Sequence, residues 1–466
     1  EYWKSIPLFM NFMDSYKVDE RIEEALVDPG VSADVRALLR RVTGRIDWQA
    51  WTSFDPIDSG NARFRSLAQQ TADRRTWRML WLAPSLPYYE LGGPWEGEIA
   101  SFTKRLIFST WSGVPKAVSS LLSYEVERQM FALREHPIKN DSADRAAIRG
   151  LLQFRHTPSG EAASMTSFAM VYPSPVLAEL GDPLALVRED GVVRSLGDMR
   201  LVVGQRITDA LEHLHVVTMN ESERVDQRWY WAAPLLLDRA ASRGAWMSHK
   251  TSYVGKWVGG SEDAGDDSNF RDHIELASKM HRGEIALGRQ PDDLVEVLTD
   301  LALGAPGVVA LRSLAHLFGT ESTEWARIQA AARMSWGFRS LFNLPDVNSL
   351  VRSVNWEQEY WRTVTQYCAE GCLTAVLDEF LHVLRESLGY YRLSREEGGA
   401  RDLLAIADAV AGAVNIRTTS LAAKDHLAES DATIHRFRTR YAMRFGSEQA
   451  ETEKSVVTAE HLRSSF

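Results

Sequence analysis

The chain has 466 residues, of which 45% are hydrophobic and 25% are charged. This is a globular composition, long enough for about three domains, so a wholly disordered segment and a disulfide-stapled miniprotein are excluded. Lysine and arginine total 53 against 63 acidic residues, a formal net charge of -10. A broadly basic surface that coats nucleic acid is therefore excluded, and any nucleic-acid contact is expected to be local.

The chain has only two cysteines, which indicates a reducing compartment, because a secreted protein of this size usually carries a disulfide framework. Its longest apolar stretches, such as Leu301 to Leu311, are shorter than the roughly 20 residues that cross a membrane. No signal peptide opens the sequence. We therefore expect a cytoplasmic protein with no membrane partner.

Both ends of the sequence suggest a fragment. The first residue is not Met, and the helical pattern of residues 458–466 stops without a Gly or Asn end signal. We expect a piece of a longer chain. The alternative is a natural C-terminus in a frayed helix.

The first hundred residues alternate short helical and extended patterns. Ser32 is expected to cap a helix that carries Val35 and Leu38. Residues 77–82 have the pattern of a short apolar strand, which Pro84 and Pro87 would end. We interpret this region as a crossing between domains.

Residues 105–126 have the pattern of a strand, a loop and a helix, which is typical of an α/β unit. Residues 105–108 are predicted to form a short buried strand, and Pro115 suits the first turn of the following helix, where its missing N–H costs nothing. That helix is predicted by apolar residues at helical spacing: Val114, Ala117, Val118, Leu121, Leu122 and Val126. The apolar runs 151–154 and 168–172 are expected to add strands to the same sheet.

From about Ser174 to about Asp431 the pattern changes to long amphipathic helices. One apolar stripe includes Ile207 and Leu211, and another includes Leu373 and Leu384. This predicts an all-helical block. Its acidic run at 259–267 fails the spacing of a calcium loop and is expected to be a surface loop.

Standard catalytic signatures are absent from the sequence. No G-x-x-x-x-G-K-[ST], G-x-G-x-x-G, H-E-x-x-H or G-x-S-x-G motif occurs, so the chain has no nucleotide-binding loop of its own. Cys368 and Cys372 stand four residues apart, but no second ligand pair is close in sequence. Packing is therefore favoured over metal binding for both cysteines.

The histidines and tryptophans give no site by themselves. His213 and His215 are two residues apart, which places them on different faces of a helix, so they are not expected to be ligands. Trp51, Trp95 and Trp257 have loop-like surroundings. An exposed tryptophan can stack on a sugar or a base, but filling of the core is the more frequent role and is favoured here.

An arginine-rich strand is predicted near the end of the chain. Residues 435–445 alternate, with Arg436, Arg438 and Arg440 on one face and Arg444 beyond them. No acidic residue occurs between Ala432 and Ser447, so these charges suit phosphate oxygens. A solvated edge strand that charge protects from aggregation is the alternative.

Two separated segments resemble the second RecA-like lobe of superfamily-two helicases and DNA translocases of the Swi/Snf kind. Residues 104–111 (Lys-Arg-Leu-Ile-Phe-Ser-Thr-Trp), with the helix from Pro115, resemble motif IV. Residues 444–447 (Arg-Phe-Gly-Ser) and the helical pattern after them resemble the next strand, its turn and the helix that leads to motif V. Strings at 80–89 and 121–125 also resemble a group of large bacterial helicase-related proteins whose second lobe is interrupted.

The resemblance implies a fold and a domain division. The expected fold is an incomplete α/β RecA-like lobe interrupted by a large all-α insertion, predominantly helical overall. Residues 1–100 would be the end of the first lobe and the interlobe connection. Residues 101–173 would begin the second lobe, 174–431 would be the insertion, and 432–466 would resume the lobe and stop before motif V. An insertion of this length is permissible because long loops cost little closure entropy.

The resemblance also implies ATP and Mg²⁺ as cofactors of the full-length protein. ATP chemistry requires a phosphate loop, an acidic pair and arginines that stabilise the transferred phosphoryl group, and none of these occurs in this sequence. The chain alone is therefore expected to bind neither cofactor and to have no ATPase activity. Its role would be to bind the DNA backbone without sequence specificity, with the insertion contacting DNA or a protein partner.

The residues that would contact the nucleic-acid backbone come partly from the resemblance and partly from their charge. They are Ser109, Thr110, Trp111, Lys116, Arg436, Arg438, Arg440, Arg444, Gly446 and Ser447. Two alternatives stay open. One is a non-enzymatic helical scaffold or interaction module, and the other is a sugar-active enzyme, for which the sequence offers no carboxylate pair of defined spacing.

Overall fold

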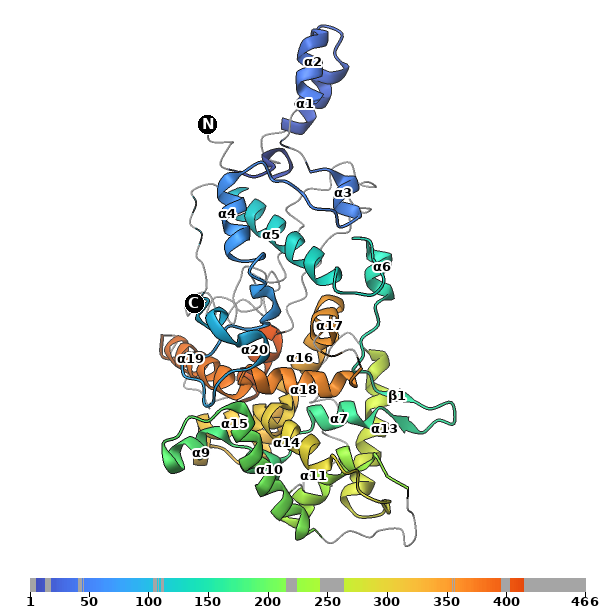
Figure 1. Ribbon diagram of the computed structural model, residues 1–466, viewed down its shortest axis with the longest axis vertical. Helices are drawn as coiled ribbons and strands as arrows, with labels where there is room; N and C mark the ends of the chain where they lie inside the picture. Colours follow the sequence, from blue (N-terminus) through green and yellow to red (C-terminus); the bar gives the residue numbers. More distant parts are fainter. Residues whose placement is uncertain are drawn as a thin grey trace. The chain divides into compact units, whose positions relative to one another are not determined.

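The computed structural model describes residues 6–12, 18–40, 44, 46–103, 107, 109, 113–214, 224–243, 264–353, 355, 357–394 and 403–414. These residues form two compact units, each of which is predominantly helical (Figure 1). The small unit contains the described residues of 1–80 and 102–149, and the large unit contains those of 81–101 and 150–415. The predicted division at residues 100, 173 and 431 stays a prediction.

The small unit surrounds one long helix, α5 (Gly113–Phe131). Ala117, Leu121 and Tyr124 of α5 are buried against apolar residues from the start of the chain. Trp51 stacks on Tyr124 with ring centroids 4.1 Å apart. The other elements are η2 (Phe9–Phe12), α1 (Val18–Val27), α2 (Ala33–Arg40), α3 (Trp48–Thr52), α4 (Ala62–Gln70), η4 (Thr76–Arg78) and α6 (Ser142–Ala147).

Two helices of the small unit are confirmed as the sequence predicted them. Helix α2 begins after Ser32, whose Oγ accepts a hydrogen bond from the backbone N–H of Val35 at 3.3 Å. Helix α5 begins at Gly113 and carries Pro115 in its first turn, where a backbone N–H would have no acceptor within the helix, so its absence costs no hydrogen bond.

The long helices that the sequence predicted after Ser174 are confirmed where the chain is described, and all of them lie in the large unit. Helix α14 packs against α10 and α18, α15 packs against α8, α16 and α19, and α16 also packs against α20. Its helices are α7 (Met165–Val171), α8 (Pro175–Leu180), α9 (Pro183–Asp190), α10 (Leu196–Glu212), α11 (Trp229–Ala240), α13 (Ala264–His281), α14 (Leu294–Gly304), α15 (Pro306–Phe318), α16 (Glu324–Phe342), α17 (Pro345–Arg352), α18 (Tyr360–Glu370), α19 (Leu373–Ser394) and α20 (Leu403–Val414). The short 3₁₀ turns are η5 (Gly93–Trp95), η6 (Gly97–Ser101) and η9 (Gly319–Glu321).

The C-terminal end of α18 is capped by a distant part of the chain, residues 81–95. The last carbonyl groups of a helix have no partner within the helix. Here Ala369 O accepts from the Tyr89 hydroxyl at 2.6 Å, and Glu370 O accepts from the Gly92 N–H at 2.9 Å. The indole N–H of Trp81 donates to the carbonyl of the next residue, Gly371, at 3.2 Å. Trp81, Tyr89 and Trp95 of this segment are buried and therefore belong to the core of the large unit.

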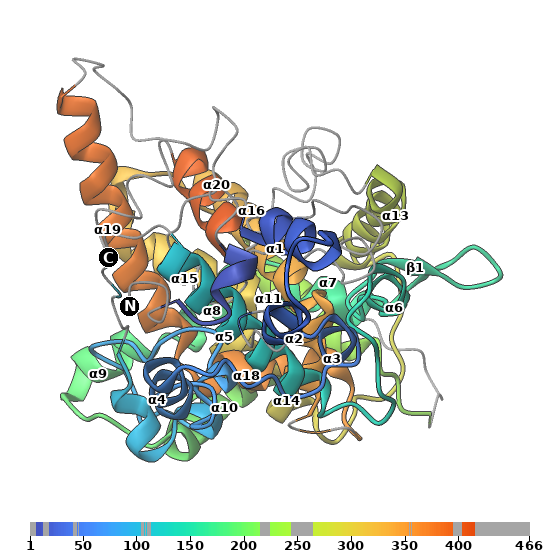
Figure 2. The same cartoon turned by 90° about the horizontal axis from the view of Figure 1, so that it is seen from above.

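The only sheet in the part of the chain that the structure describes has two short antiparallel strands, β1 (Arg155–His156) and β2 (Ala162–Ala163). It forms a hairpin that projects beside α13 (Figures 1 and 2). No RecA-like α/β lobe is evident among the described residues. The strands predicted at 105–108 and 435–445 lie outside them, apart from Ile107.

Three strand predictions are wrong. Residues 168–172 belong to the buried helix α7 and its C-cap, since a short apolar run fits a buried helix as well as a strand. Residues 77–82 begin with η4 and then run irregularly. Residues 151–154 precede β1 and form no strand. The backbone of Leu152 instead bonds to two side chains at the end of α16: its N–H donates to the C-cap residue Asn343, and its carbonyl accepts from Arg339.

Part of the segment 259–267, which was predicted to be a surface loop, is helical. Residues 264–267 lie in the first turn of α13, while residues 259–263 lie outside the described residues. Acidic residues suit a first helical turn because they face the positive end of the helix dipole.

Helices α14 and α15 form the centre of the large unit and are buried along most of their length. Within the described residues, no single helix is long and apolar enough to cross a membrane, although 294–304 and 306–321, bent by 47°, meet that test as a pair.

Gly304 at the end of α14 lies against the backbone of α18. A methyl group there would overlap Thr365 O and come within 2.9 Å of Ala369 N.

We predict opposite effects for two glycine-to-alanine substitutions. Gly304→Ala should lower the free energy of unfolding by roughly 1–3 kcal/mol, because the methyl group meets backbone atoms that cannot rotate away. Gly412→Ala in α20 meets no atom within 4 Å and should raise it by about 0.5–1 kcal/mol, because glycine is costly in a helix. Urea unfolding followed by circular dichroism measures both. A Gly304→Ala protein as stable as the unsubstituted chain would contradict the packing of α14 on α18.

Candidate functional site

The residues predicted to bind nucleic acid lie mostly outside the described part of the chain. Ser109 is described and exposed, and the backbone of Lys116 lies in the first turn of α5. These two therefore lie at the entry to the same helix. Outside the described residues lie Thr110, Trp111, Arg436, Arg438, Arg440, Arg444, Gly446 and Ser447.

The cysteines and tryptophans that the sequence analysis considered are core residues where they are described. Cys368 and Cys372 are both buried without exposure and form no disulfide. Burial raises the pKa of both thiols. Trp51 and Trp95 are also buried, which confirms the core role over exposed stacking, and Trp257 lies outside the described residues.

The histidines show no ligand cluster. The His213 ring Nδ1 lies 2.7 Å from the carbonyl of Asp209, and His215 is outside the described residues. Among the residues that the structure describes, no group of three or more His, Cys, Asp or Glu is arranged to hold a metal ion.

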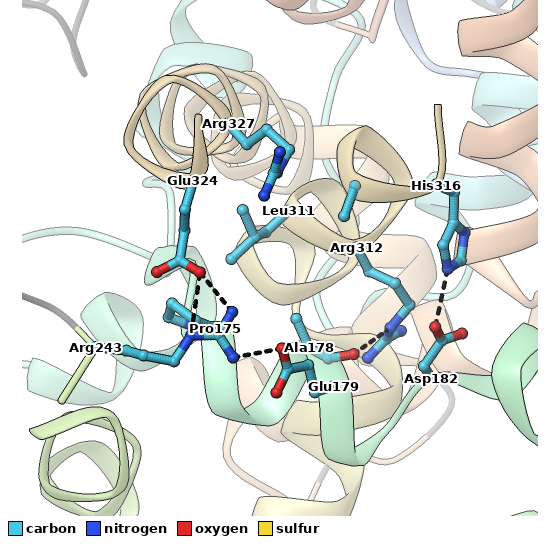
Figure 3. A pocket seen from close by; sticks show the side chains of 11 residues that line it. Pro175, Ala178, Glu179, Asp182, Arg243, Leu311, Arg312, His316, Glu324 and Arg327 are labelled. Carbon is cyan, nitrogen blue, oxygen red and sulfur yellow. Dashed lines mark hydrogen bonds and ion pairs between the residues drawn. The ribbon is translucent and has the colours of Figure 1, made fainter. Parts of the chain in front are cut away.

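A cavity of about 130 Å³ opens in the large unit between α8, α15 and α16 (Figure 3). This charged cavity is the candidate functional site. Its apolar lining comes from α8 and α15, and its charged lining comes from several elements. The lining residues are Pro175, Ala178, Glu179, Asp182, Arg243, Leu311, Arg312, Ala315, His316, Glu324 and Arg327.

Arg243, which follows α11, pairs with two glutamates at one side of the cavity. Its guanidinium contacts Glu179 of α8, and its Nε donates to Glu324 at the start of α16 at 3.1 Å. Burial opposes the positive charge, but the hydrogen bonds to the two carboxylates outweigh it, so the pKa of Arg243 is raised. The carboxylate of Glu179 is 68% exposed, and it can therefore leave this pairing at small cost.

His316 lies between two carboxylates at the other side of the cavity (Figure 3 shows Asp182). Its Nε2 lies 3.0 Å from Asp182, and its Nδ1 lies 2.8 Å from Asp378, which also accepts from the Tyr88 hydroxyl at 2.7 Å. Burial alone would lower the pKa of His316, but the two carboxylates raise it to about 9. The ring is therefore an imidazolium at neutral pH and donates from both nitrogens.

Asp182 has a second role as the N-cap of α9. Its Oδ1 accepts from the backbone N–H groups of Leu184 and Ala185 at 3.0 and 3.1 Å. Burial acts to raise its pKa, but hydrogen bonding to His316 and the charge of Arg312 lower it overall. This carboxylate therefore stays ionised and joins the start of α9 to α15.

Arg312 and Arg327 differ from the other cations because they hydrogen-bond to neutral acceptors. Arg312 is 2% exposed and donates to Ala178 O at 3.0 Å, to Thr374 Oγ1 at 2.9 Å and to Ala302 O. Arg327 uses a single nitrogen, Nη1, which donates to Gly319 O at 2.7 Å and to Ser322 O at 2.6 Å. Burial lowers the pKa of both guanidinium groups.

Sequence reasoning did not find this cavity. Its charged residues come from positions spread between 179 and 327, and only the tertiary fold brings them together. The one local signal was Asp182 followed by Pro183, which is typical of a helix start rather than of a ligand site.

Comparisons of the chain with models of known protein families, with curated proteins and with solved structures found no match.

We predict that His316→Gln destabilises the protein in a pH-dependent way. The pKa rises from 6.5 to about 9, and at 1.36 kcal/mol per pKa unit this corresponds to roughly 3 kcal/mol of stabilisation. The native state holds this proton more tightly than the unfolded state, so the stabilisation is complete below pH 6.5 and is lost as the pH rises through 9. The loss caused by His316→Gln should therefore be large at pH 6 and should shrink by pH 9.5.

Urea unfolding at pH 6, 7.5 and 9.5 checks this prediction. His213→Gln is the matched control, because this histidine is exposed at the end of α10, and it should change the free energy of unfolding by less than about 0.5 kcal/mol. A His316→Gln effect that is equal at all three pH values would contradict a charged His316.

Proposed function

We propose that this chain is part of an ATP-dependent DNA helicase or translocase. In this proposal its RecA-like second motor lobe binds the nucleic-acid backbone and is interrupted by a helical insertion that includes most of the large unit. The observation that carries the proposal is the motif IV resemblance at 104–111, followed by a helix from Pro115. That helix is present as α5.

The start of α5 has the chemistry of a phosphate contact. The first N–H groups of a helix have no partner within the helix, and the helix dipole makes this end positive. Lys116 lies in this first turn, and the exposed Ser109 precedes it. Helix α5 is also held in place by packing, because its residues Ala117, Leu121 and Tyr124 are buried in the core of the small unit.

The large unit has the character that an inserted domain requires. It is compact and has its own buried core, and the chain enters it at Trp81, leaves it after Ser101 and enters it again after Arg149. A domain with its own core tolerates insertion into another domain, because closing the connection costs little entropy. The strands that would complete the motor lobe are those predicted at 105–108 and 435–445, outside the described residues.

ATP and Mg²⁺ belong to the full-length protein in this proposal. The sequence contains no phosphate loop and no motif for Mg²⁺, and both are needed for phosphoryl transfer. The chain alone is therefore proposed to bind DNA without hydrolysing ATP.

A non-enzymatic helical scaffold or interaction module is the second candidate. The predominantly helical character of both units favours it. The two candidates differ in salt dependence, because binding to phosphates releases counterions and weakens steeply as salt rises. A scaffold that binds another protein through its helices has no such requirement.

We predict that Arg436→Ala combined with Arg440→Ala weakens DNA binding and flattens its salt dependence. Each phosphate contact contributes about 0.9 to the slope of log affinity against log salt on duplex DNA, so the double variant should reduce the slope by roughly 2. Fluorescence anisotropy with labelled duplex and single-stranded oligonucleotides, between 50 and 200 mM salt, measures both quantities.

Arg289→Ala is the matched control, since Arg289 is an exposed arginine of the large unit that pairs with Asp292. It should leave the slope unchanged. An unchanged slope in the double variant would remove these arginines from the binding site. No salt-dependent binding by the unsubstituted chain would contradict the helicase proposal and favour the scaffold.

A further inference from the structure

The cavity between α8, α15 and α16 contains more cationic groups than its carboxylates bind directly. Two carboxylates share Arg243, and two share His316. Arg312 and Arg327 have no carboxylate bonded to them among the described residues and donate to carbonyl and hydroxyl oxygens. Asp182 and Glu324 act on these two guanidinium groups only through space, so no carboxylate occupies the hydrogen-bonding positions that both groups present at the cavity lining.

Both arginines also have N–H groups left over. A guanidinium has five N–H donors. Within the described residues, Arg312 makes one hydrogen bond from each of its three nitrogens, which leaves two N–H groups without an acceptor. The Nε and Nη2 of Arg327 also have no acceptor there, and Figure 3 shows this side chain pointing toward Leu311 in the cavity. Arg312 is buried and Arg327 is partly buried; unfilled donors on such charges are costly, and an oxyanion would satisfy them.

The size of the cavity limits what can bind. Sites for drug-sized molecules occupy about 300–1,000 Å³, whereas this cavity has about 130 Å³. It therefore admits a single small group rather than a nucleoside. Arg243, Arg312 and Arg327 reach it from three different elements, an arrangement that suits a tetrahedral oxyanion better than a planar carboxylate.

We propose that this cavity binds one phosphate group through Arg327 and Arg312, with Arg243 joining them when Glu179 swings out. Glu179 and Glu324 bind the guanidinium of Arg243, so their carboxylates compete with the ligand. The site does not depend on the proposed function. The phosphate is either free or part of a nucleic-acid backbone, and the two sources are distinguished by competition.

The test is a titration of the full chain with inorganic phosphate at constant ionic strength, followed by calorimetry. The unsubstituted chain should bind phosphate at one site, at least tenfold more tightly than acetate. Arg327→Gln should weaken binding at least tenfold, and the control Arg289→Gln should change it by less than twofold. No saturable binding, or equal binding by Arg327→Gln, would overturn the proposal.

A second variant is needed because Arg327 also donates to the carbonyls of Gly319 and Ser322, so Arg327→Gln can weaken binding by disturbing the fold. Glu179→Gln removes a competing carboxylate that is 68% exposed. It should tighten phosphate binding about threefold or more, a gain that a folding defect cannot produce. Binding that is unchanged or weaker in Glu179→Gln would overturn the proposed competition and with it the site.

Competition by a short oligonucleotide identifies the source of the phosphate. Displacement of inorganic phosphate in proportion to oligonucleotide occupancy would place a backbone phosphate in the cavity. Independent binding of both ligands would assign the cavity to a free phosphate group, and either result supports the site. Arg436→Ala with Arg440→Ala should leave the phosphate titration unchanged, so failure of the cavity and failure of the DNA-binding proposal are separate outcomes.

Discussion

The large unit depends on the way its helix α18 ends. A helix that ends inside a protein leaves carbonyl groups that must find donors, and here Tyr89 and Gly92 supply them from a segment nearly three hundred residues earlier. Gly371 is required at this point, because a methyl group there would come within 2.7 Å of the Trp95 ring and 2.8 Å of Trp81 Nε1. The next residue, Cys372, has a positive φ of 45° and starts α19 in a new direction. Helix α19 carries Asp378, whose carboxylate lies 2.8 Å from Nδ1 of His316 beside the charged cavity.

Local signals in the sequence were sufficient to predict a helix where the cause of that helix lies in its own residues. The cap at Ser32, the proline in the first turn of α5 and the apolar stripe of α19 each have a physical cause within a few residues. Residues 168–172 were predicted wrongly because a short apolar run has no distinguishing period. Their helix α7 is set by burial against neighbouring helices and not by a local pattern.

The candidate sites differ in how far sequence reasoning reached. The nucleic-acid contacts proposed at the start of α5 come from a contiguous string and stay a prediction, because most of the other residues proposed to bind nucleic acid lie outside the described part of the chain. The charged cavity could not be predicted, because Glu179, Arg243 and Arg327 are brought together only by the packing of α8 and α16 beside α15. Arg312 illustrates the same limit. Its buried guanidinium donates to the carbonyl groups of Ala178 and Ala302, and no spacing in the sequence reveals these partners.

The proposals for the two units are compatible, since a motor lobe that binds a phosphate backbone and an inserted helical domain with an oxyanion cavity would act on the same kind of ligand.

The central claim is that this chain is a segment of a helicase. Translation of the coding DNA on either side of it, in frame, tests this claim most directly. The account predicts a phosphate loop and an acidic box upstream of Glu1, and an arginine motif downstream of Phe466. In-frame start and stop signals next to these two residues would contradict it, and the helical scaffold would then be the better description.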